Sequence, residues 1–155
     1  MNTQSNLNYR VATPLDQEVV VSLLAELLDE LGPTEVAERV KPQLHNDITK
    51  ALDKPTIRIF LAYDRHLPVG LSRADILDAD PVFRLRADHR CGYIDQMYVK
   101  PIYRCQQIGS ILLQMCEAWF REQGMGHTLL HASRQAMRFY EHRGFLSNRE
   151  MFKRL

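Results

Sequence analysis

Residues 92–132 constrain the fold of this chain more than any other stretch. The segment begins with the apolar run GYIDQMYV, passes through the polar loop RCQQIGS, and continues as a long amphipathic segment. From Ile108 onward, apolar residues recur with the spacing of one helical face until Gly124. The run HTLLHA at 127–132 predicts a further strand. A strand–helix–strand crossover of this kind requires two parallel strands in one sheet.

The segments before this crossover predict an antiparallel sheet with helices packed on it. A helical stretch is expected at 34–52, and Pro42 within it predicts either a kink or a division into two short helices. The turn DRHL joins two β-rich runs and predicts a hairpin. The expected elements are a strand at 9–13, a helix that ends at Gly32, the helical stretch at 34–52, and hairpin strands at 56–63 and 68–77.

The C-terminal part predicts one more helix and a last strand. SRQAMRFYEHRG is expected to form the helix, with Ser133 as N-cap and Gly144 after its end. FLSN and MFKRL could supply the strand. These elements predict an α+β fold, a single domain with a mixed central sheet flanked by helices. Because the chain has 155 residues, we expect one domain at 8–155, preceded by a flexible N-terminus at 1–7.

Composition and charge disfavour several classes of function. The formal net charge is +1, so nucleic-acid binding through an excess of basic residues is not expected. No apolar run approaches the roughly 18 residues needed to span a bilayer, so no membrane association is expected. MNTQSNLNYR lacks the apolar core of a signal peptide. Three cysteines without a C-x-x-C pair favour a reducing, cytoplasmic location.

The histidines do not predict a metal site. His127 and His131 are four residues apart, but the segment between them is expected to be a strand. The spacing therefore lacks the helical geometry of a zinc motif, and no metal is expected.

The loop RCQQIGS is the first candidate binding site. A helix N-terminus presents unpaired N–H groups and the positive end of the helix dipole, and a preceding loop can add further amides. Gly109 allows close approach to the backbone, and Arg104 adds a forked cation suited to phosphate. A diphosphate is the natural ligand of such a loop, although the same residues could form only a connection between strand and helix. The loop is neither a Walker A motif nor a dinucleotide fingerprint.

Two signatures within 92–145 resemble those of the GNAT superfamily of N-acetyltransferases. The first, YIDQMYVKPIYRCQQIGSILLQMCEAWFREQG, is similar to a strand followed by the family pattern Arg/Gln-x-x-Gly-x-Gly/Ala. Arg104 and Gly109 match this pattern, and Gln107 stands in place of the first glycine. If that position needs a positive φ, a residue other than glycine costs about 1–2 kcal/mol.

The second signature, RQAMRFYEHRGF, is similar to the family pattern of alanine, three residues, tyrosine, and then Gly-Phe. Ala136, Tyr140, Gly144 and Phe145 match it, and Ser133 stands where the family often has asparagine. The resemblance implies a GNAT-like fold in which a splayed strand pair opens a slot for the cofactor.

By this resemblance the cofactor is acetyl-coenzyme A, used as a co-substrate. Loop amides would hold its diphosphate, and the last residues of the strand would pair with its pantetheine arm as in β-augmentation. Residues of the second signature would flank the arm. The residues assigned to the cofactor are Met97, Tyr98, Val99, Arg104, Cys105, Gln106, Gln107, Ile108, Gly109, Ser110, Ser133, Ala136 and Tyr140.

Two residues are candidates for catalysis. The resemblance implies that Tyr140 protonates the departing thiolate, whereas residue type alone favours an aromatic that packs in the core. Asp95 is a candidate base; on a regularly alternating strand it shares a face with Tyr93 and Met97. The alternative for Asp95 is an exposed strand carboxylate.

The function predicted is therefore transfer of an acetyl group to a primary amine, by direct attack through a tetrahedral intermediate. The acceptor is expected to be a small molecule. The resemblance implies that its pocket is formed by the helical pair and the polar loop at 78–91. The alternatives are a protein or peptide N-acetyltransferase and a non-catalytic module that senses coenzyme A. The resemblance also makes a homodimer possible.

Overall fold

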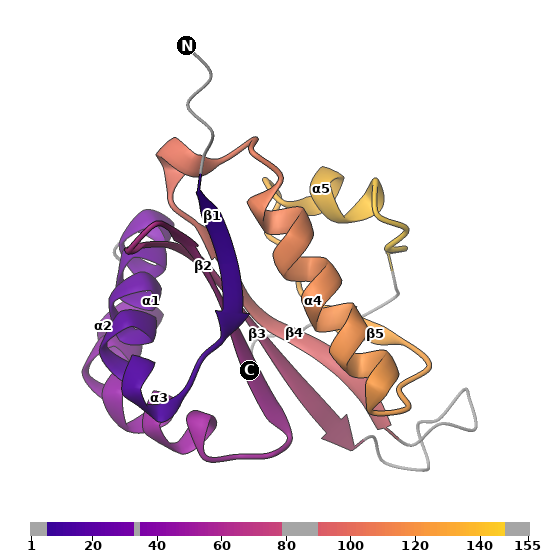
Figure 1. The fold of residues 1–155 in the computed structure, drawn as a ribbon, viewed down its shortest axis with the longest axis horizontal. Coiled ribbons are helices and arrows are strands. Elements are labelled where there is room, and N and C mark those ends of the chain that lie inside the picture. The colour runs from indigo at the N-terminus through magenta and orange to yellow at the C-terminus, as the bar shows by residue number, and fades with distance from the viewer. Residues whose placement is uncertain (1–5, 33–34, 79–89, 148–155) are drawn as a thin grey trace.

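The computed structural model describes residues 6–32, 35–78 and 90–147. Five strands form one sheet in the order β1-β2-β3-β4-β5 (Figure 1). The first four are antiparallel neighbours, and β5 runs parallel to β4. The predicted hairpin and the parallel crossover are both confirmed. The strands are β1 (Leu7–Val11), β2 (Ile57–Asp64), β3 (Leu67–Asp78), β4 (Arg90–Val99) and β5 (Thr128–Leu130).

The predicted division at Pro42 is also confirmed, because this residue lies in a 3-10 turn (Lys41–Gln43) that separates two short helices. Proline lacks the N–H that a continuous α-helix would use at that position. The helices are α1 (Gln17–Leu31), α2 (Glu35–Val40), α3 (Leu44–Leu52), α4 (Ile108–Glu122) and α5 (Met137–Glu141).

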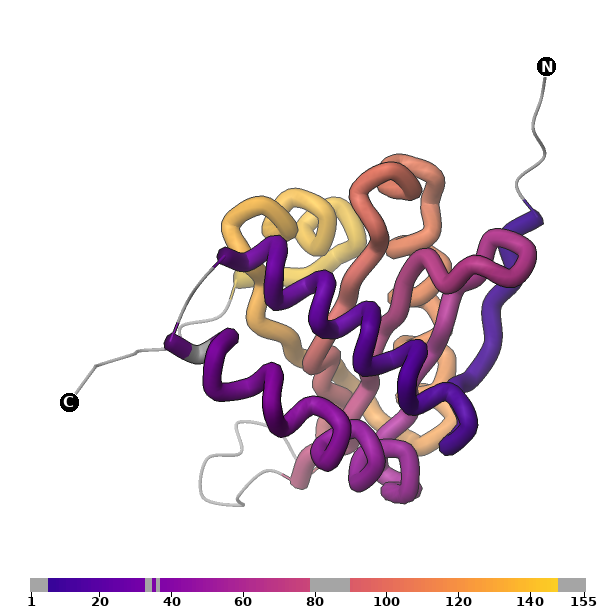
Figure 2. Tube along the Cα trace, turned by 90° about the vertical axis from the view of Figure 1, so that its left-hand side faces the viewer, coloured from indigo at the N-terminus to yellow at the C-terminus, as the bar shows by residue number. Residues whose placement is uncertain are grey.

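The helices cover the two faces of the sheet (Figures 1 and 2). α1, α2 and α3 lie on one face, where buried residues of α1 and α3 pack against β2, β3 and β4. α4 lies on the other face, and α5 lies beside it. Cys116, Trp119 and Phe120 of α4 are buried there, as their helical spacing predicts. The junction between β4 and α4 therefore lies at one end of a sheet that is packed on both sides.

A β-bulge at Asp95 interrupts the regular alternation of β4. Ile94 pairs with Ala74 and Gln96 pairs with Arg73, so Asp95 is an extra residue without a partner on β3. Ile94 and Met97 therefore both belong to the core on the α4 face, although they are three residues apart. The prediction that Asp95 shares a face with Met97 is wrong. The extra residue of the bulge shifts the alternation of side chains along β4, so these two side chains lie on opposite faces of the sheet.

The C-terminal elements differ from the predicted ones. α5 begins at Met137 with Ala136 as its N-cap, so Ser133 does not cap it. Instead, the Ser133 carbonyl accepts hydrogen bonds from the amides of Ala136 and Met137 in a preceding turn. Residues 145–147 form no strand.

Several predicted segments lie outside the described residues. These are MFKRL, most of the polar loop at 78–91, and most of the N-terminal segment at 1–7, of which Leu7 already belongs to β1. Among the helices that are described, none is long and apolar enough to cross a membrane.

Candidate active site at the β4–α4 junction

The loop between β4 and α4 has the backbone geometry of an anion-binding nest. Cys105 and Gln107 have φ angles of 62° and 64°, with Gln106 between them outside the positive-φ region. This alternation turns successive N–H groups toward one side of the loop. Gln107 is the N-cap of α4, and no side chain caps the first turn by a hydrogen bond. The amides from Gln106 to Ser110 therefore remain available to a ligand at the positive end of the α4 dipole.

Gly109 serves close packing rather than an unusual backbone conformation. A Cβ atom at this position would lie 3.4 Å from the tip of the Phe139 ring and 3.9 Å from Val99. The glycine therefore allows α5 to pack closely against the first turn of α4. In contrast, Gln107 has a left-handed backbone conformation, which is strained for a residue with a Cβ atom. This position is the one where the family pattern has a glycine.

Arg104 is engaged within the protein. Its Nε donates to the Val99 carbonyl at 2.9 Å, and its Nη2 donates to both carboxylate oxygens of Glu30 at 2.6 and 2.8 Å. The hydrogen bonds to Glu30 raise the pKa of Arg104. The role of Arg104 as a phosphate ligand stays a prediction. Its positive charge is already neutralised by Glu30, which belongs to α1 on the opposite face of the sheet.

Beside the loop, one edge of β4 has no paired strand among the described residues. β5 pairs with β4 only from Gly92 to Ile94, whereas β4 continues to Val99. The Val99 carbonyl faces this open edge, where it meets Arg104. Backbone groups of alternate residues point to the same edge, so those of Met97 face it too. The Tyr98 carbonyl points to β3, only 2.8 Å from where a Gly70 Cβ would lie.

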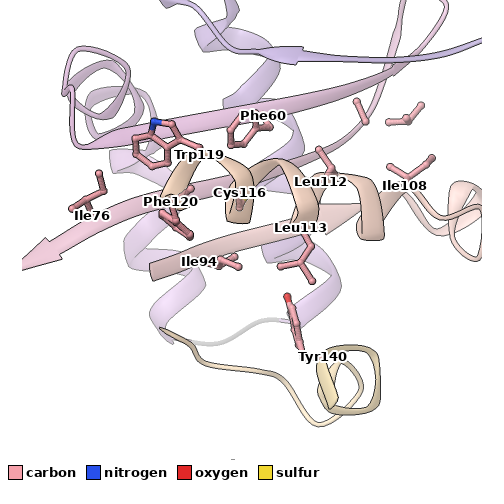
Figure 3. Close-up of a cluster of buried hydrophobic side chains, with 13 residues drawn as sticks. Phe60, Ile76, Ile94, Ile108, Leu112, Leu113, Cys116, Trp119, Phe120 and Tyr140 are labelled. Atoms are coloured by element: carbon pink, nitrogen blue, oxygen red, sulfur yellow. The ribbon is translucent and has the colours of Figure 1, made fainter. Parts of the chain in front are cut away.

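Tyr140 is buried in the core cluster that also contains Leu112 and Leu113 of α4 (Figure 3). Its hydroxyl donates to the Met97 sulfur at 3.7 Å, and its ring makes edge contacts with Phe139 and Phe145. Burial, assisted by the nearby Cys116 thiol when that is ionised, raises the pKa of Tyr140 to about 12. The phenol therefore stays protonated at neutral pH. The packing interpretation is confirmed, because Tyr140 lies in the core. The acid role stays a prediction, and the hydroxyl points at Met97 of β4.

Tyr140 also borders a cavity of about 680 Å³ between β5 and α5. Tyr93 and His131 line the same cavity, and the Tyr93 hydroxyl lies 2.7 Å from His131 Nδ1. A volume of this order accommodates a small organic ligand.

Asp95 belongs to a half-buried cluster of charged residues. Its carboxylate lies 3.4 Å from Nη1 of Arg73, which also holds Asp75 through two hydrogen bonds of 2.7 and 2.8 Å. Burial raises the pKa of Asp95, Arg73 opposes this shift, and Asp75 adds to it. The Asp95 side chain keeps 33% exposure, so a proton can still reach it from solvent. Neither a freely solvated carboxylate nor a fully neutralised ion pair describes this environment.

Three features of the site were not predicted. They are the left-handed conformation of Cys105, the link from Arg73 to Asp95, and the ion pair of Arg104 with Glu30. The last two join residues that are close only in space. The bulge did leave a trace in the sequence, because the apolar spacing of Ile94, Met97 and Val99 is not a regular period of two. Within the described residues, no group of His, Cys, Asp and Glu side chains could hold a metal ion.

The site lies within the part of the chain that matches a known family. The sequence model described as the Acetyltransferase (GNAT) family matches residues 22–145, which is most of the chain. The chain belongs to the GNAT family of acetyltransferases. This confirms the resemblance found in the two signatures, and with it the enzyme class at the level of the family.

A curated relative of this GNAT protein supports the same family. It is a provisionally named acetyltransferase of Bacillus subtilis (strain 168), 28% identical over 92 residues. The alignment covers 59% of this chain and 55% of that protein, so it spans about half of the relative's length.

Solved structures show the same fold over nearly the whole chain. A GCN5-related N-acetyltransferase from Ralstonia eutropha JMP134 has a TM-score of 0.86 and 21% identity, covering 96% of this chain and 98% of that one. A protein from Clostridium acetobutylicum, described as an acetyltransferase and solved with acetyl-CoA, has a TM-score of 0.84 and 22% identity, covering 96% of both chains. Aminoglycoside N-acetyltransferase AAC(6')-Iy, solved with CoA, has a TM-score of 0.79 and 18% identity, covering 100% and 98%.

Proposed function

We propose that this protein is an acetyl-coenzyme A-dependent N-acetyltransferase that acts on a primary amine of a small molecule. The observation that carries the proposal is the junction of β4 and α4. There a nest of amides, an open strand edge and the hydroxyl of Tyr140 adjoin one another. Each of these features suits a different part of one elongated ligand.

The residues present fit coenzyme A. The amides of Gln106 to Ser110 suit a diphosphate, because they combine left-handed loop geometry with the start of a 15-residue helix. The open edge at Met97 and Val99 suits the amide groups of a pantetheine arm. Ala136 is small and half-buried next to the core that contains Tyr140, which leaves room for the thioester end.

Two residues of the chain would each transfer one proton during the reaction. Acetyl-coenzyme A supplies the acetyl group as a thioester, whose C–S bond breaks as the new C–N bond forms. Asp95 would take the proton that the acceptor nitrogen loses, directly or through water. Tyr140 would give its proton to the departing sulfur and regain one from solvent. The raised pKa of Tyr140 keeps that proton in place before reaction.

The acceptor is proposed to be a small cationic amine. Asp95 and Asp75 share the single cation Arg73, and the buried Gln96 side-chain oxygen has no hydrogen-bond partner among the described residues. An amine brings both positive charge and hydrogen-bond donors to such acceptors. AAC(6')-Iy, an aminoglycoside N-acetyltransferase, has the same fold, which supports this substrate class.

A thermal-shift titration with acetyl-coenzyme A, followed by a panel of amines read by thiol release, tests the proposal. We expect a ligand-dependent rise in Tm and thiol release with at least one small amine. Gly109→Glu is the matched variant, since it places a carboxylate in the nest beside Phe139; it should lose both responses while its far-UV circular dichroism is unchanged. Release only with peptide amines would indicate a protein acetyltransferase. Binding without any release would indicate a coenzyme A sensor.

A further inference from the structure

We propose that Arg143, which neither sequence signature assigns, supplies the cation for a phosphate group of coenzyme A. This inference rests on the proposed function and adds a specific ligand residue to its site. Arg143 follows α5 and is remote in sequence from the loop that begins α4. The fold nevertheless brings its guanidinium to the first turn of α4, where Nη2 donates a hydrogen bond to Ser110 Oγ.

The guanidinium is held in a defined position. Its Nη1 donates to the Phe139 carbonyl at 2.7 Å, and its central carbon lies 3.7 Å from the centre of the Phe139 ring. The Phe139 ring in turn packs against Gly109, since a Cβ there would lie 3.4 Å from its tip. Arg143, Phe139 and Gly109 therefore form one stack on the nest. A cation held in this way loses little conformational freedom when a ligand arrives.

Arg143 also retains binding capacity. A guanidinium has five N–H donors, and the hydrogen bonds to Ser110 and Phe139 use two of them. No carboxylate among residues 6–32, 35–78 and 90–147 forms an ion pair with it. Arg104 differs in this respect, because Glu30 already binds its guanidinium on both carboxylate oxygens. Arg143 therefore keeps a positive charge beside the nest that none of the described carboxylates compensates.

Phosphate is the chemistry that this arrangement recognises. A forked guanidinium binds phosphate oxygens in a planar, bidentate manner, and backbone amides at a helix start bind the same group. Coenzyme A carries two sources of such oxygens, the diphosphate and the 3′-phosphate. The two differ experimentally, because 3′-dephospho-coenzyme A keeps only the diphosphate.

The test is calorimetric titration of coenzyme A and 3′-dephospho-coenzyme A into the full chain and its variants. Arg143→Gln should weaken coenzyme A binding about tenfold, the low end for a charge-assisted hydrogen bond. The residual affinity should depend less on ionic strength, which a purely structural role would not produce. Arg143→Lys should lose less, about threefold, because it keeps the charge but not the fork. A loss of affinity for both ligands would show that Arg143 binds the diphosphate. A loss of affinity for coenzyme A alone would show that it binds the 3′-phosphate.

Arg121→Gln is the matched control, since it removes the same charge from an exposed position at the far end of α4. Equal losses in Arg121→Gln and Arg143→Gln would overturn the proposal, because only overall charge would then matter. Unchanged affinity of Arg143→Gln for both ligands would overturn it as well. If Arg143→Gln does not fold, the Lys variant decides. A loss of about threefold with the wild-type salt dependence supports the proposal, and a loss above tenfold would mean that packing on Phe139 dominates and would refute the charge role. Failure of the wild-type chain to bind coenzyme A would instead refute the proposed function itself.

Discussion

Arg104 at the start of the loop before α4 binds Glu30 near the end of α1, with Nη2 at 2.6 and 2.8 Å from the two carboxylate oxygens. α1 and α4 lie on opposite faces of the sheet, so this ion pair ties the loop before α4 to the helical layer on the other side. The same guanidinium also holds the Val99 carbonyl on the open edge of β4. A ligand phosphate would have to compete with Glu30 for Arg104.

Glu30→Gln should therefore tighten binding of coenzyme A, by about two- to fivefold, because it frees a cation near the nest. The free energy of unfolding should change by less than about 1 kcal/mol, since the pair is partly exposed. Calorimetry and thermal melting measure the two quantities. Glu117→Gln, which breaks the pair with Arg121 on α4, is the control and should leave affinity unchanged. Weaker binding in Glu30→Gln would mean that the ion pair holds the loop in its binding conformation.

Gln107→Gly should stabilise the protein. Gln107 has a φ of 64°, which costs a residue with a Cβ about 1–2 kcal/mol and costs glycine nothing. Part of this gain is offset by the greater entropy of glycine in the unfolded chain, so we expect about 1 kcal/mol and a rise in Tm of about 2–4 °C. Gln106→Gly provides the comparison within the same loop. Gln106 does not have a positive φ, so its replacement should lower Tm, and a fall in both variants would argue against strain at Gln107.

Asp95→Asn should lower turnover most strongly near neutral pH, where an ammonium acceptor must still lose its proton. The defect should shrink at high pH, because free amine becomes abundant without a base. Since burial raises the pKa of Asp95, the wild-type pH profile of kcat/KM should show an acid limb displaced above the usual carboxylate range. Arg73→Gln should move that limb further up, since Arg73 opposes the shift. A loss in Asp95→Asn that is independent of pH would point to substrate positioning instead.

Tyr140→Phe should reduce kcat by about 10²-fold, the low end of the 10²–10⁴ expected for a positioned acid, because a thiolate is already a fair leaving group. Acetyl-coenzyme A affinity should stay close to wild type, because the ring and its contacts with Phe139 and Phe145 are kept. Steady-state kinetics and calorimetry on the purified variant separate the two effects. Full activity of Tyr140→Phe would exclude the acid role. A loss of acetyl-coenzyme A affinity that matches the loss of kcat would show that Tyr140 contributes to cofactor binding instead.

The same substitution should alter the stability of the protein in alkali. The pKa of Tyr140 is raised from 10.0 to about 12 by burial, so the folded state retains this proton more tightly than the unfolded state. The resulting stability is fully present below pH 10 and is lost as the pH rises through about 12. Tyr140→Phe should therefore unfold with a shallower dependence on pH in this window, as measured by denaturant titration at a series of pH values. An identical dependence in both proteins would show that other groups, such as the buried Cys116 thiol, govern alkaline unfolding.

Local patterns in the sequence determined much of the fold. The apolar spacing in α4 and the β-rich hairpin follow from periodicities of 3.6 and 2, which any buried face imposes on the sequence. Pro42 separated α2 and α3 because a missing N–H acts within one turn of the chain. The family pattern raised the condition of a positive φ at Gln107, because a glycine usually stands there, and the structure shows a φ of 64°.

Tertiary structure alone decided how the charges of the site are distributed. Arg104 binds Glu30, Arg73 joins Asp75 with Asp95, and Arg143 reaches Ser110, and only Arg73 and Asp75 are near each other in sequence. Such contacts depend on which faces of the sheet the helices cover and on the bulge at Asp95, which redirects side chains along β4. Periodicity and propensity act over a few residues, whereas an ion pair acts over a few ångströms between segments of any separation. The sequence therefore determined most of the elements that form, and only their packing decided how the charged residues of the site are paired.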